Sequence, residues 1–208
     1  MITDVGSTKN DIIAKISRIK RKDINWISSH PIAGSEVSGP QNGNENLFVN
    51  KWTVIIKQKN LQSLEMKKIF KFWKFLGSKP VIMDADQHDK IFAITSHLPH
   101  LIAYNLILTA TNFEISNKNN VLRFSAGGLR DFSRIAASNE IMWRDIFFNN
   151  KKNMLKVIDN FIKNLKIFKQ DIKSNRKNLE TKLKNLKKVR QKIVLLKQDT
   201  SKPDFGRV

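Results

Sequence analysis

Four histidines are the side chains of this sequence best suited to acid–base chemistry near neutral pH. They stand at His30, His88, His97 and His100 in a chain of 208 residues that has no cysteine. The lack of cysteine excludes disulfides, thiolate metal sites and a cysteine nucleophile. His97 and His100 are three residues apart, as two ligands on a helix can be, but no carboxylate or third histidine lies at a recognised metal spacing. We therefore expect no metal site.

Three other polar side chains have ordinary structural interpretations when each is taken alone. Ser7 follows Gly6 and suits the N-cap of a helix. Asp131 and Arg134 are three residues apart on a predicted helix, where a local ion pair is the simplest interpretation. A lone histidine is likewise more often structural than catalytic. A catalytic assignment therefore depends on the elements that would bring these residues together.

The first 84 residues alternate between strand-like and helix-like patterns. A glycine turn at Val5–Ser7 precedes a helix expected from Thr8 to about Lys20, and a second helix is expected at Leu61–Leu76, closed by Gly77. Pro31 should end regular structure and hold His30 extended. The glycine- and asparagine-rich residues 34–46 should form a loop. Strands are expected at Asn25–Ser29, Trp52–Lys57 and Lys79–Met83, and this alternation predicts a parallel sheet flanked by helices.

From Asp86 onward the pattern is helical, so the fold class is α/β followed by all-α. Residues 86–112 are apolar nearly all round, which is typical of a helix buried on several sides. Pro99 should kink this helix. Gly127-Gly128 should break the chain before a short helix at residues 131–137, and further helix should follow from about Asn139.

The C-terminal part carries a heptad-like apolar stripe with a plausible break between two helices at Ser174-Asn175. Packing within the chain and pairing of subunits explain such a stripe equally well. The stripe consists of Ile158, Ile162, Leu165, Ile172, Leu179, Leu183, Leu186 and Ile193, with polar residues at Lys169, Arg176 and Arg190.

The formal charge of +20 is concentrated in the same region, because Lys151–Asp199 holds 16 Lys and Arg residues against 4 Asp and Glu. A charge of this size raises nucleic acid as a partner. The basic residues are mostly lysine among asparagine and isoleucine, and no nucleic-acid-binding fingerprint is present. We interpret them as a solvated face and do not expect a nucleic-acid partner.

Composition places the chain in the globular class, with 40% hydrophobic and 9% aromatic residues. No basic region leads into an apolar run near Met1, and no uninterrupted apolar run approaches the roughly 20 residues of a membrane span. Together with the lack of cysteine, this favours a cytoplasmic protein with no membrane partner.

Six short segments resemble one family when they are taken together and in order, and the resemblance covers most of the chain. The family is that of prephenate/arogenate (cyclohexadienyl) dehydrogenases. The closing QDTSKPDFGR at 198–207 is similar to the end of proteobacterial members. The six segments are GSTK at 6–9, SHPIAGSE at 29–36, LFVNKW at 47–52, TSHLPH at 95–100, AGGLRDFSRIAAS at 126–138 and MWRDI at 142–146.

The resemblance implies a fold and an activity. Residues 1–84 would form the C-terminal half of a Rossmann-type nucleotide-binding domain. Residues 85–198 would form a substrate-binding and dimerisation domain like that of 6-phosphogluconate dehydrogenase, and 199–208 a tail. The enzyme would be a cytoplasmic homodimer of tyrosine biosynthesis. It would oxidise and decarboxylate prephenate to 4-hydroxyphenylpyruvate, or arogenate to tyrosine, with hydride transfer to NAD or NADP.

The resemblance also assigns roles to single residues. His30 matches the catalytic histidine, which takes the proton of the substrate's ring hydroxyl. Ser7 matches the serine that bridges cofactor and histidine, and Arg134 the arginine that holds a substrate carboxylate. Asp131 would orient His100 or Arg134. The positions expected to line the substrate pocket are Ser96, His100, Gly127, Asp131 and Trp143, beside Arg134.

One hallmark of the Rossmann fold does not occur in the sequence. The chain has eight glycines, and they nowhere form Gly-x-Gly-x-x-Gly. The family carries this motif upstream of the segment that Met1 begins, so roughly three βα units, on the order of 90 residues, would be missing. We therefore expect a fragment that binds NAD(P)⁺ poorly and is inactive alone, with exposed sheet edges at 54–56 and 81–83.

Two other classes of function fit parts of the sequence. The chain could be a non-catalytic helical dimerisation module, or a basic helical protein that binds nucleic acid. A dehydrogenase of the β-hydroxyacid type has similar architecture, but it relies on a catalytic lysine that AGGLRDFSRIAAS does not offer at a matching place.

Overall fold

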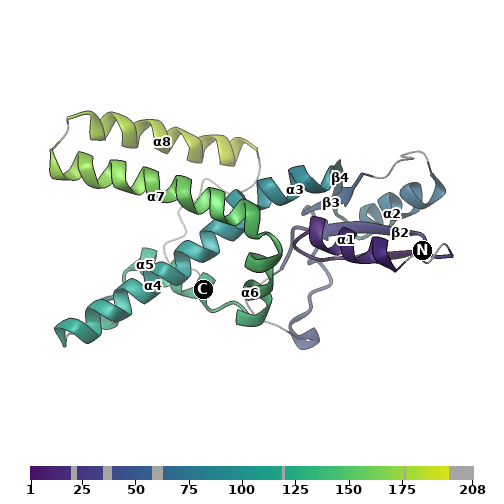
Figure 1. Cartoon of the computed structure of the whole chain (residues 1–208), viewed down its shortest axis with the longest axis horizontal. Coiled ribbons are helices and arrows are strands. Elements are labelled where there is room, and N and C mark those ends of the chain that lie inside the picture. The colour runs from purple at the N-terminus through teal and green to yellow at the C-terminus, as the bar shows by residue number, and fades with distance from the viewer. Residues whose placement is uncertain (20–22, 35–38, 58–62, 119, 176, 197–208) are drawn as a thin grey trace. The chain divides into compact units, whose positions relative to one another are not determined.

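The computed structural model describes residues 1–19, 23–34, 39–57, 63–118, 120–175 and 177–196 (Figure 1). The chain forms two compact units, Met1–Val157 and Ile158–Val208, which are described separately. Two segments of the family resemblance fall partly or wholly outside the described residues. These are the end of SHPIAGSE, at residues 35 and 36, and the closing QDTSKPDFGR.

A four-stranded sheet lies in the first unit, in the order β1-β2-β3-β4. Its strands are β1 (Ile2–Asp4), β2 (Trp26–Pro31), β3 (Trp52–Ile56) and β4 (Lys79–Met83). β1 runs parallel to β2 and β3 runs parallel to β4, whereas β2 and β3 are antiparallel and place His30 opposite Val54. The strands fall close to their predicted positions, but the expectation of an entirely parallel sheet is wrong.

The connection between β2 and β3 explains the reversal of direction. A parallel pair needs a crossover, usually through a helix, whereas an antiparallel pair can be joined by a loop. Within the described part of residues 32–51, the one helical element is the short 3-10 turn η1 (Pro40–Asn42). β2 ends at Pro31, as predicted, although the N–H of the next residue still donates to the Trp52 carbonyl at 2.7 Å. His30 is extended, as predicted.

Helices cover both faces of the sheet. On one face, α2 (Leu64–Phe75) packs Met66, Ile69 and Trp73 against Ile27 and Ile55. On the other face, Phe92 of α3 (Ala85–Phe92) packs with Val54 and Ile56, beside Ile13 of α1 (Asn10–Arg18). β3 is therefore a central strand, and residues 54–56 are at most 3% exposed. The predicted exposed edge is wrong for β3, whereas β4 is an edge strand with Ile82 40% exposed.

The helical run after β4 contains a change of helix type. α3 continues through a π-helical turn, η2 (Ala93–His97), into α4 (Leu98–Asn117). Pro99 lacks an N–H and crowds the carbonyl four residues earlier, so ordinary α-helical bonding cannot continue through this point. The structure thus has a π-helical turn directly before Pro99, whereas the kink itself stays a prediction.

Most of this helical run is not buried, contrary to the sequence expectation. Ala103 is the buried residue of α4. By length and composition, Ala85–Asn117 is the one helix within the described ranges that could cross a membrane, with a mean hydropathy of 1.4 over 18 of its residues. However, Phe92 and Ala93 are packed into the sheet unit, so the run begins as an internal helix of this unit.

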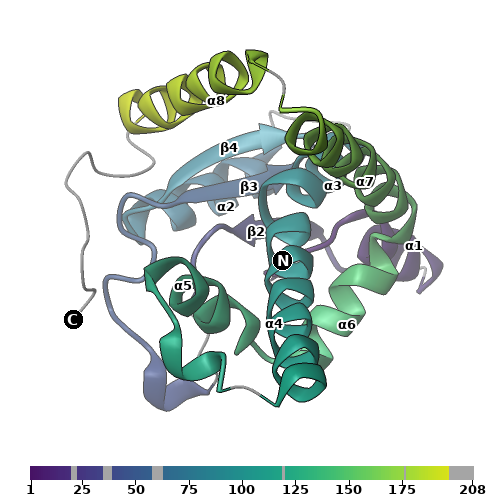
Figure 2. The same cartoon turned by 90° about the vertical axis from the view of Figure 1, so that its left-hand side faces the viewer.

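Two shorter helices complete the first unit. α5 (Gly127–Ala136) lies alongside α4 in both cartoon views, and α6 (Glu140–Asn149) follows it (Figure 2). The Asn139 side chain caps α6 by accepting a hydrogen bond from the Met142 N–H at 2.8 Å. Gly127 and Gly128 form the first turn of α5, so the predicted break before residue 131 is wrong.

The second unit is a helical hairpin of the larger part of α7 (Lys151–Lys173) and α8 (Asn178–Leu195). The chain turns at Ser174-Asn175, as predicted, and Asn175 has a φ of 48°. Lys182 of α8 forms an ion pair with the buried Asp171 of α7. Much of the apolar stripe stays exposed, including Ile162, Leu165, Ile172, Leu183, Leu186 and Ile193.

Gly77 offers a direct test of how α2 is terminated. Its φ is +79°, and a Cβ built there would lie 3.0 Å from Val49 Cγ2 and 3.2 Å from Val49 Cα. We expect Gly77→Ala to lower the free energy of unfolding by about 1–2 kcal/mol, because a left-handed alanine is strained. Chemical denaturation measures the change. Gly128→Ala is the matched control, since no atom lies within 4 Å of its added Cβ, and an equal loss in both variants would contradict the argument.

Candidate functional site

A cavity of about 500 Å³ in the first unit collects side chains from both the sheet and the helices. It contains six of the eight residues singled out in the sequence: Ser7, His30, Ser96, His100, Arg134 and Trp143. Residues separated by more than 120 positions in the chain thus share one site. Lys51, Phe92 and Met142 also line it, and the sequence did not single them out.

Gly127 and Asp131 are the two expected pocket residues that this single chain does not bring to the cavity. Both are exposed on α5. They precede Arg134 by two turns and one turn of the helix, so Gly127 lies roughly 10 Å away along the helix axis. Their spacing puts Gly127 and Asp131 on the same face of α5 as Arg134, but at different positions along the helix axis.

His30 enters the cavity from the end of β2 and is held from behind by a second histidine. His30 Nδ1 lies 2.7 Å from His88 Nε2, and the two rings meet edge to face. Phe92 packs against both rings, with centroid distances of 5.0 Å and 4.4 Å. Because β2 is extended and α3 is packed on the sheet, the imidazole of His30 has a fixed orientation.

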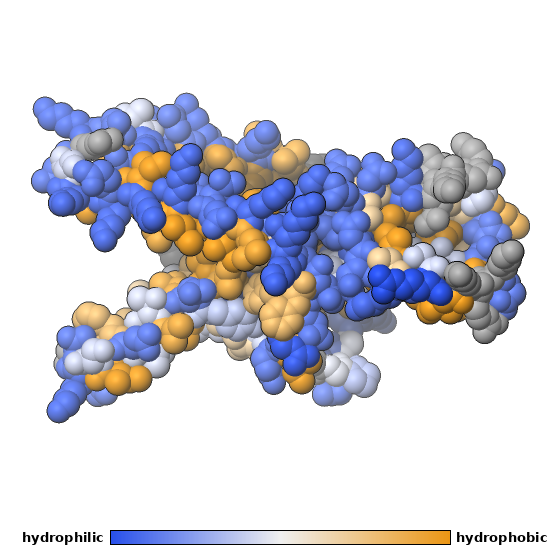
Figure 3. All heavy atoms as spheres, in the orientation of Figure 1, coloured by the Kyte–Doolittle hydropathy of each residue, from blue (hydrophilic) through white to orange (hydrophobic). Residues whose placement is uncertain are grey.

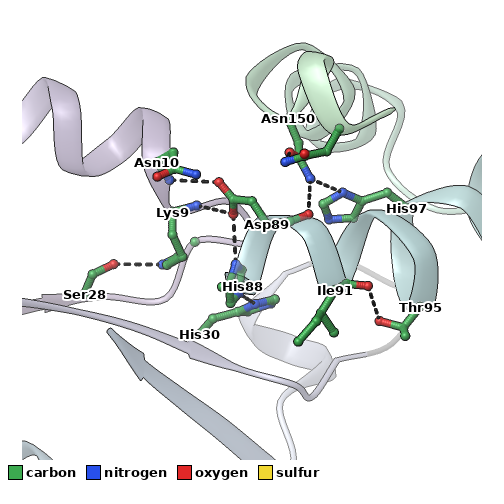
Figure 4. A network of polar contacts seen from close by, with 12 residues as sticks. Lys9, Asn10, Ser28, His30, His88, Asp89, Ile91, Thr95, His97 and Asn150 are labelled. Carbon is green, nitrogen blue, oxygen red and sulfur yellow. Dashed lines mark hydrogen bonds and ion pairs between the residues drawn. The ribbon is translucent and has the colours of Figure 1, made fainter. Parts of the chain in front are cut away.

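The contact continues to a buried carboxylate (Figure 4). His88 Nδ1 lies 2.9 Å from Asp89 Oδ1. The same carboxylate accepts the backbone N–H groups of Lys9 and Asn10, each at 2.9 Å. His88 is 0% exposed and Asp89 is 1% exposed. Sequence reasoning missed both residues, although a charged residue beside a histidine in an apolar helix was a visible signal.

Lys9 is the buried cation of this region, at 0% exposure. Its ammonium group contacts Asp4 Oδ2 at 2.6 Å, the Ser29 carbonyl at 2.6 Å and Ser28 Oγ at 3.1 Å. Three acceptors satisfy the three ammonium protons, so the charge can remain in the core. Lys9 thereby fixes the turn that carries Ser7 against the end of β2.

His97 belongs to a separate arm of the same polar network. The Asn150 side-chain amide donates to the Asp89 carbonyl at 2.8 Å and lies 3.2 Å from His97 Nδ1. Asn153 in turn donates to Asn150 Oδ1 at 2.8 Å. This arm ties α3 and the π-helical turn to the start of α7, and His97 is not among the residues that line the cavity.

The opposite wall of the cavity combines an aromatic surface with a cation. His100 stacks on Trp143, with ring centroids 3.6 Å apart and an interplanar angle of 20°. His100 Nδ1 lies 3.0 Å from the Ser96 carbonyl, so this nitrogen carries the hydrogen and donates it. Arg134 is close enough to lower the pKa of His100, although burial is the larger cause. This wall suits a planar, negatively charged molecule.

Burial keeps the histidines of the network neutral. Burial, together with the smaller effects of nearby His88, Lys9 and His97, lowers the pKa of His30 to about 2, while Asp89 acts in the opposite direction. Burial likewise lowers the pKa of His97 to about 4 and that of His88. Burial alone would raise the pKa of Asp89, but the hydrogen bonds that it accepts from His88, Asn10 and Lys9 lower that pKa below its usual value. The site therefore pairs an anionic carboxylate with neutral imidazoles.

Comparisons with known families decide the relationship of the chain. Residues 1–82 match the family model of the nucleotide-binding domain of prephenate dehydrogenase, and residues 84–189 match that of its dimerization domain. The chain belongs to the prephenate dehydrogenase family. The predicted fold class, a partial Rossmann-type half followed by a helical dimerisation half, is thereby confirmed, with the mixed sheet as a correction.

Among curated relatives, the cyclohexadienyl dehydrogenase of Zymomonas mobilis is 36% identical over 166 residues, covering 80% of this chain and 56% of the relative. The prephenate dehydrogenase of Bacillus subtilis is 32% identical over 165 residues, covering 79% of this chain and 44% of the relative. The chain thus spans about half the length of the curated relatives it matches.

Solved structures agree with this relationship. The Aquifex aeolicus prephenate dehydrogenase, in complex with hydroxyphenyl propionate and NAD⁺, has a TM-score of 0.85 and 34% identity, over 93% of this chain and 67% of that one. The Synechocystis arogenate dehydrogenase has a TM-score of 0.76 over 92% of this chain and 69% of that one. At 24% identity, that second likeness shows the fold alone.

The lowered histidine pKa values make stability depend on pH. Unfolding returns His30 and His97 to a pKa near 6.5, so the unfolded chain binds protons that the folded chain does not. The contribution of these histidines to the free energy of unfolding is fully present above that pH and is lost as pH falls toward their folded-state pKa values. In that range each histidine raises the unfolding equilibrium constant roughly tenfold per pH unit. Denaturation midpoints between pH 7.5 and about 4.5 measure this loss.

A variant without one of these groups isolates its share. We expect His97→Gln to reduce the slope of the unfolding free energy against pH by the amount that corresponds to the uptake of about one proton. Asp86→Asn, which removes an exposed carboxylate outside the histidine network, is the control and should leave the slope unchanged. A stability that stays constant between pH 7.5 and 4.5 would show that these histidines are not held neutral.

Proposed function

We propose that this chain carries the substrate pocket and the catalytic base of an enzyme that oxidises and decarboxylates prephenate, or arogenate, with NAD⁺ or NADP⁺. The carrying observation is that Ser7, His30 and Arg134 line one cavity, with the imidazole held neutral. The family membership supports the same chemistry. We further propose a cytoplasmic location and the domain division 1–84, 85–198 and 199–208 for the reasons given from the sequence.

The base of the proposed reaction is His30. A neutral imidazole accepts the proton of the ring hydroxyl as hydride leaves the carbon that bears it. That hydroxyl oxygen becomes a carbonyl, and loss of CO₂ then makes the ring aromatic. Ser7 lines the same cavity, and in the proposed reaction its hydroxyl orients the base against the reacting carbon.

The remaining wall holds the substrate. Arg134 binds a carboxylate through two parallel donors, which suits a planar anion better than a point charge does. Trp143 is 6% exposed, and its Nε1–H has no hydrogen-bond partner among the described residues. A bound carboxylate or carbonyl oxygen would satisfy this donor. Ser96 and His100 also line the cavity, and Lys51 adds a second cation to its lining. Gly127 and Asp131 stay in the proposal as residues of α5 beyond the single-chain cavity.

The residues present fit only one end of a nicotinamide dinucleotide. When bound, NAD(P)⁺ supplies the hydride acceptor. Ser7 and the turn fixed by Lys9 can face the nicotinamide, but none of the eight glycines forms the phosphate-binding motif. We therefore propose that these 208 residues alone bind NAD(P)⁺ poorly and do not turn over, and that the activity needs a glycine-rich βα unit supplied to the sheet.

A fusion tests the activity. The segment that precedes the matched region of the Zymomonas mobilis cyclohexadienyl dehydrogenase is placed ahead of Met1, and NADH formation with prephenate is followed by absorbance. We expect the fusion to turn over and the 208-residue chain to stay at least about 10³-fold slower, because cofactor and substrate are not held together. Equal rates would contradict the proposed dependence on the glycine-rich unit.

Substitutions in the fusion test the assigned roles. We expect His30→Asn to lower kcat by about 10²–10⁴-fold, the usual contribution of a general base. Arg134→Lys should mainly raise KM, since it keeps the charge but loses the two-pronged donor. Lys151→Gln, at the start of α7 and outside the cavity, is the control. A His30→Asn fusion with unchanged kcat would remove His30 from the reaction.

We also propose that the chain forms a homodimer through its helical half. The family model over residues 84–189 is that of a dimerization domain. Large apolar side chains of α4 stand exposed, including Leu108 at 57%, Phe113 at 55% and Ile115 at 71%. Figure 3 shows apolar side chains among polar ones along this helix. Such surface is rarely left open in a soluble chain.

The dimer can be weakened at one point of α4. Leu108→Glu places a charge on the exposed apolar surface, and we expect it to raise the dimer dissociation constant at least about tenfold, by roughly the loss of one buried leucine. Sedimentation equilibrium measures the change. Leu64→Glu is the matched control, because Leu64 is 61% exposed on α2 in the sheet half. A monomeric wild-type chain, or equal weakening by both variants, would refute the α4 interface.

A further inference from the structure

A continuous chain of contacts runs from the start of α1 to the cavity. It passes from the backbone N–H groups of Lys9 and Asn10 to the Asp89 carboxylate, then to His88 and finally to His30. Every side-chain step is 2.7–2.9 Å long. Figure 4 shows the groups side by side, drawn from α1, α3 and β2. Of these groups, the proposed function uses only His30, and it assigns no role to His88 or Asp89.

The hydrogen bond between His88 and Asp89 has only one possible donor. Asp89 accepts two backbone N–H groups where α1 begins, and this end of a helix favours an anion. An ionised carboxylate is an acceptor only. The hydrogen between His88 Nδ1 and Asp89 Oδ1 must therefore be carried by His88, which fixes His88 as the tautomer protonated on Nδ1.

The second link follows from the first. A neutral imidazole protonated on Nδ1 has a lone pair on Nε2. His88 Nε2 is the atom that lies 2.7 Å from His30 Nδ1, so His30 must donate there. If His30 were protonated on Nε2 instead, two lone pairs would face each other at this distance inside a buried site. A buried pair of that kind is strongly disfavoured.

We propose that His88 and Asp89 are positioning residues that lock His30 in the tautomer protonated on Nδ1, and so present its Nε2 as the bare nitrogen that accepts the substrate's proton. The catalytic meaning of the lock rests on the proposed function, whereas the tautomer itself does not. The lock also supports the product of the proton transfer. A protonated His30 keeps its Nδ1–H directed at the His88 lone pair, with the Asp89 charge behind it.

The charged groups around His30 make this arrangement necessary. Lys9 from the turn before α1 and the other histidines from α3 and the π-helical turn disfavour a proton on His30, and Asp89 is the anion that favours one. Arg134 and Lys51 add positive charge at the cavity itself. A base in such surroundings gains from an anion that reaches it through a fixed hydrogen bond, because the bond directs the field along one axis.

Nitrogen NMR of the full 208-residue chain tests the lock without cofactor or substrate. Two-bond ¹⁵N–¹H correlations show which ring nitrogen of each neutral histidine carries the hydrogen. We expect Nδ1–H for both His30 and His88 at pH 7. A spectrum with Nε2–H as the main form of His30, or of His88, overturns the proposal.

Variants show whether His88 is the cause. His88→Leu keeps the core apolar but removes the acceptor, and we expect loss of the Nδ1–H form of His30 in favour of Nε2–H, the form that free imidazole side chains prefer. His88→Gln, whose amide oxygen can replace the lost acceptor, should restore Nδ1–H. His97→Leu, at an equally buried histidine outside the chain of contacts, should leave His30 unchanged.

The outcomes separate this inference from the proposed function. An unchanged His30 tautomer in a folded His88→Leu chain overturns the lock, whatever the fusion enzyme does. If that variant does not fold, the wild-type spectrum and His88→Gln decide the question. Conversely, a fusion that fails to oxidise prephenate leaves the tautomer assignment standing and removes only its catalytic meaning.

Discussion

The Asp89 carboxylate is the interaction on which the arrangement of the first unit depends. It is 1% exposed and binds the first two N–H groups of α1, while its neighbour His88 reaches the end of β2 through His30. Its backbone carbonyl accepts from Asn150 at the end of α6. One residue therefore connects the nucleotide-binding half, the helical half and the proposed base. A buried anion costs a large desolvation penalty, and it is stable here because several donors converge on it. Removing it would leave the backbone N–H groups of Lys9 and Asn10, and the Nδ1 of His88, without their acceptor.

The second constraint is the π-helical turn before Pro99. An α-helix repeats every 3.6 residues, so a continuous helix through this region would place its polar side chains at regular steps around the axis. The wider turn changes that phase once, between the buried His88–Asp89 pair and His100. As a result, one helical run directs Asp89 toward α1, while Ser96 and His100 line the cavity. Turns of this kind are often found at functional sites because they rotate the residues that follow them.

Local patterns predicted the elements well, because each depends on residues near in sequence. The strand at Trp52–Ile56 is a short run of β-formers, and α2 is followed by Gly77, the residue type that most readily adopts a φ of +79°. The direction of β2 against β3 could not be read in the same way, since it depends on how the loop between them crosses the sheet. The exposure of α4 was also beyond local reasoning. An all-apolar helix is equally consistent with a core position and with a surface that another subunit covers.

The candidate site shows the same division. Family resemblance pointed to Ser7, His30 and Arg134, and these three do share a cavity. It gave no reason to choose His88 and Asp89, because their importance arises from the meeting of three elements in space. The packing of these three elements also sets the pKa of His30. Burial is the largest cause that lowers the pKa of His30 to about 2, and nearby Lys9 contributes to it, so this imidazole is neutral at pH 7. In the proposed reaction, a substrate carboxylate held by Arg134 would bring negative charge into the same cavity and favour a proton on His30. In the proposed reaction, Arg134 and His30 would thus couple recognition of the anion to proton transfer, because both line one cavity.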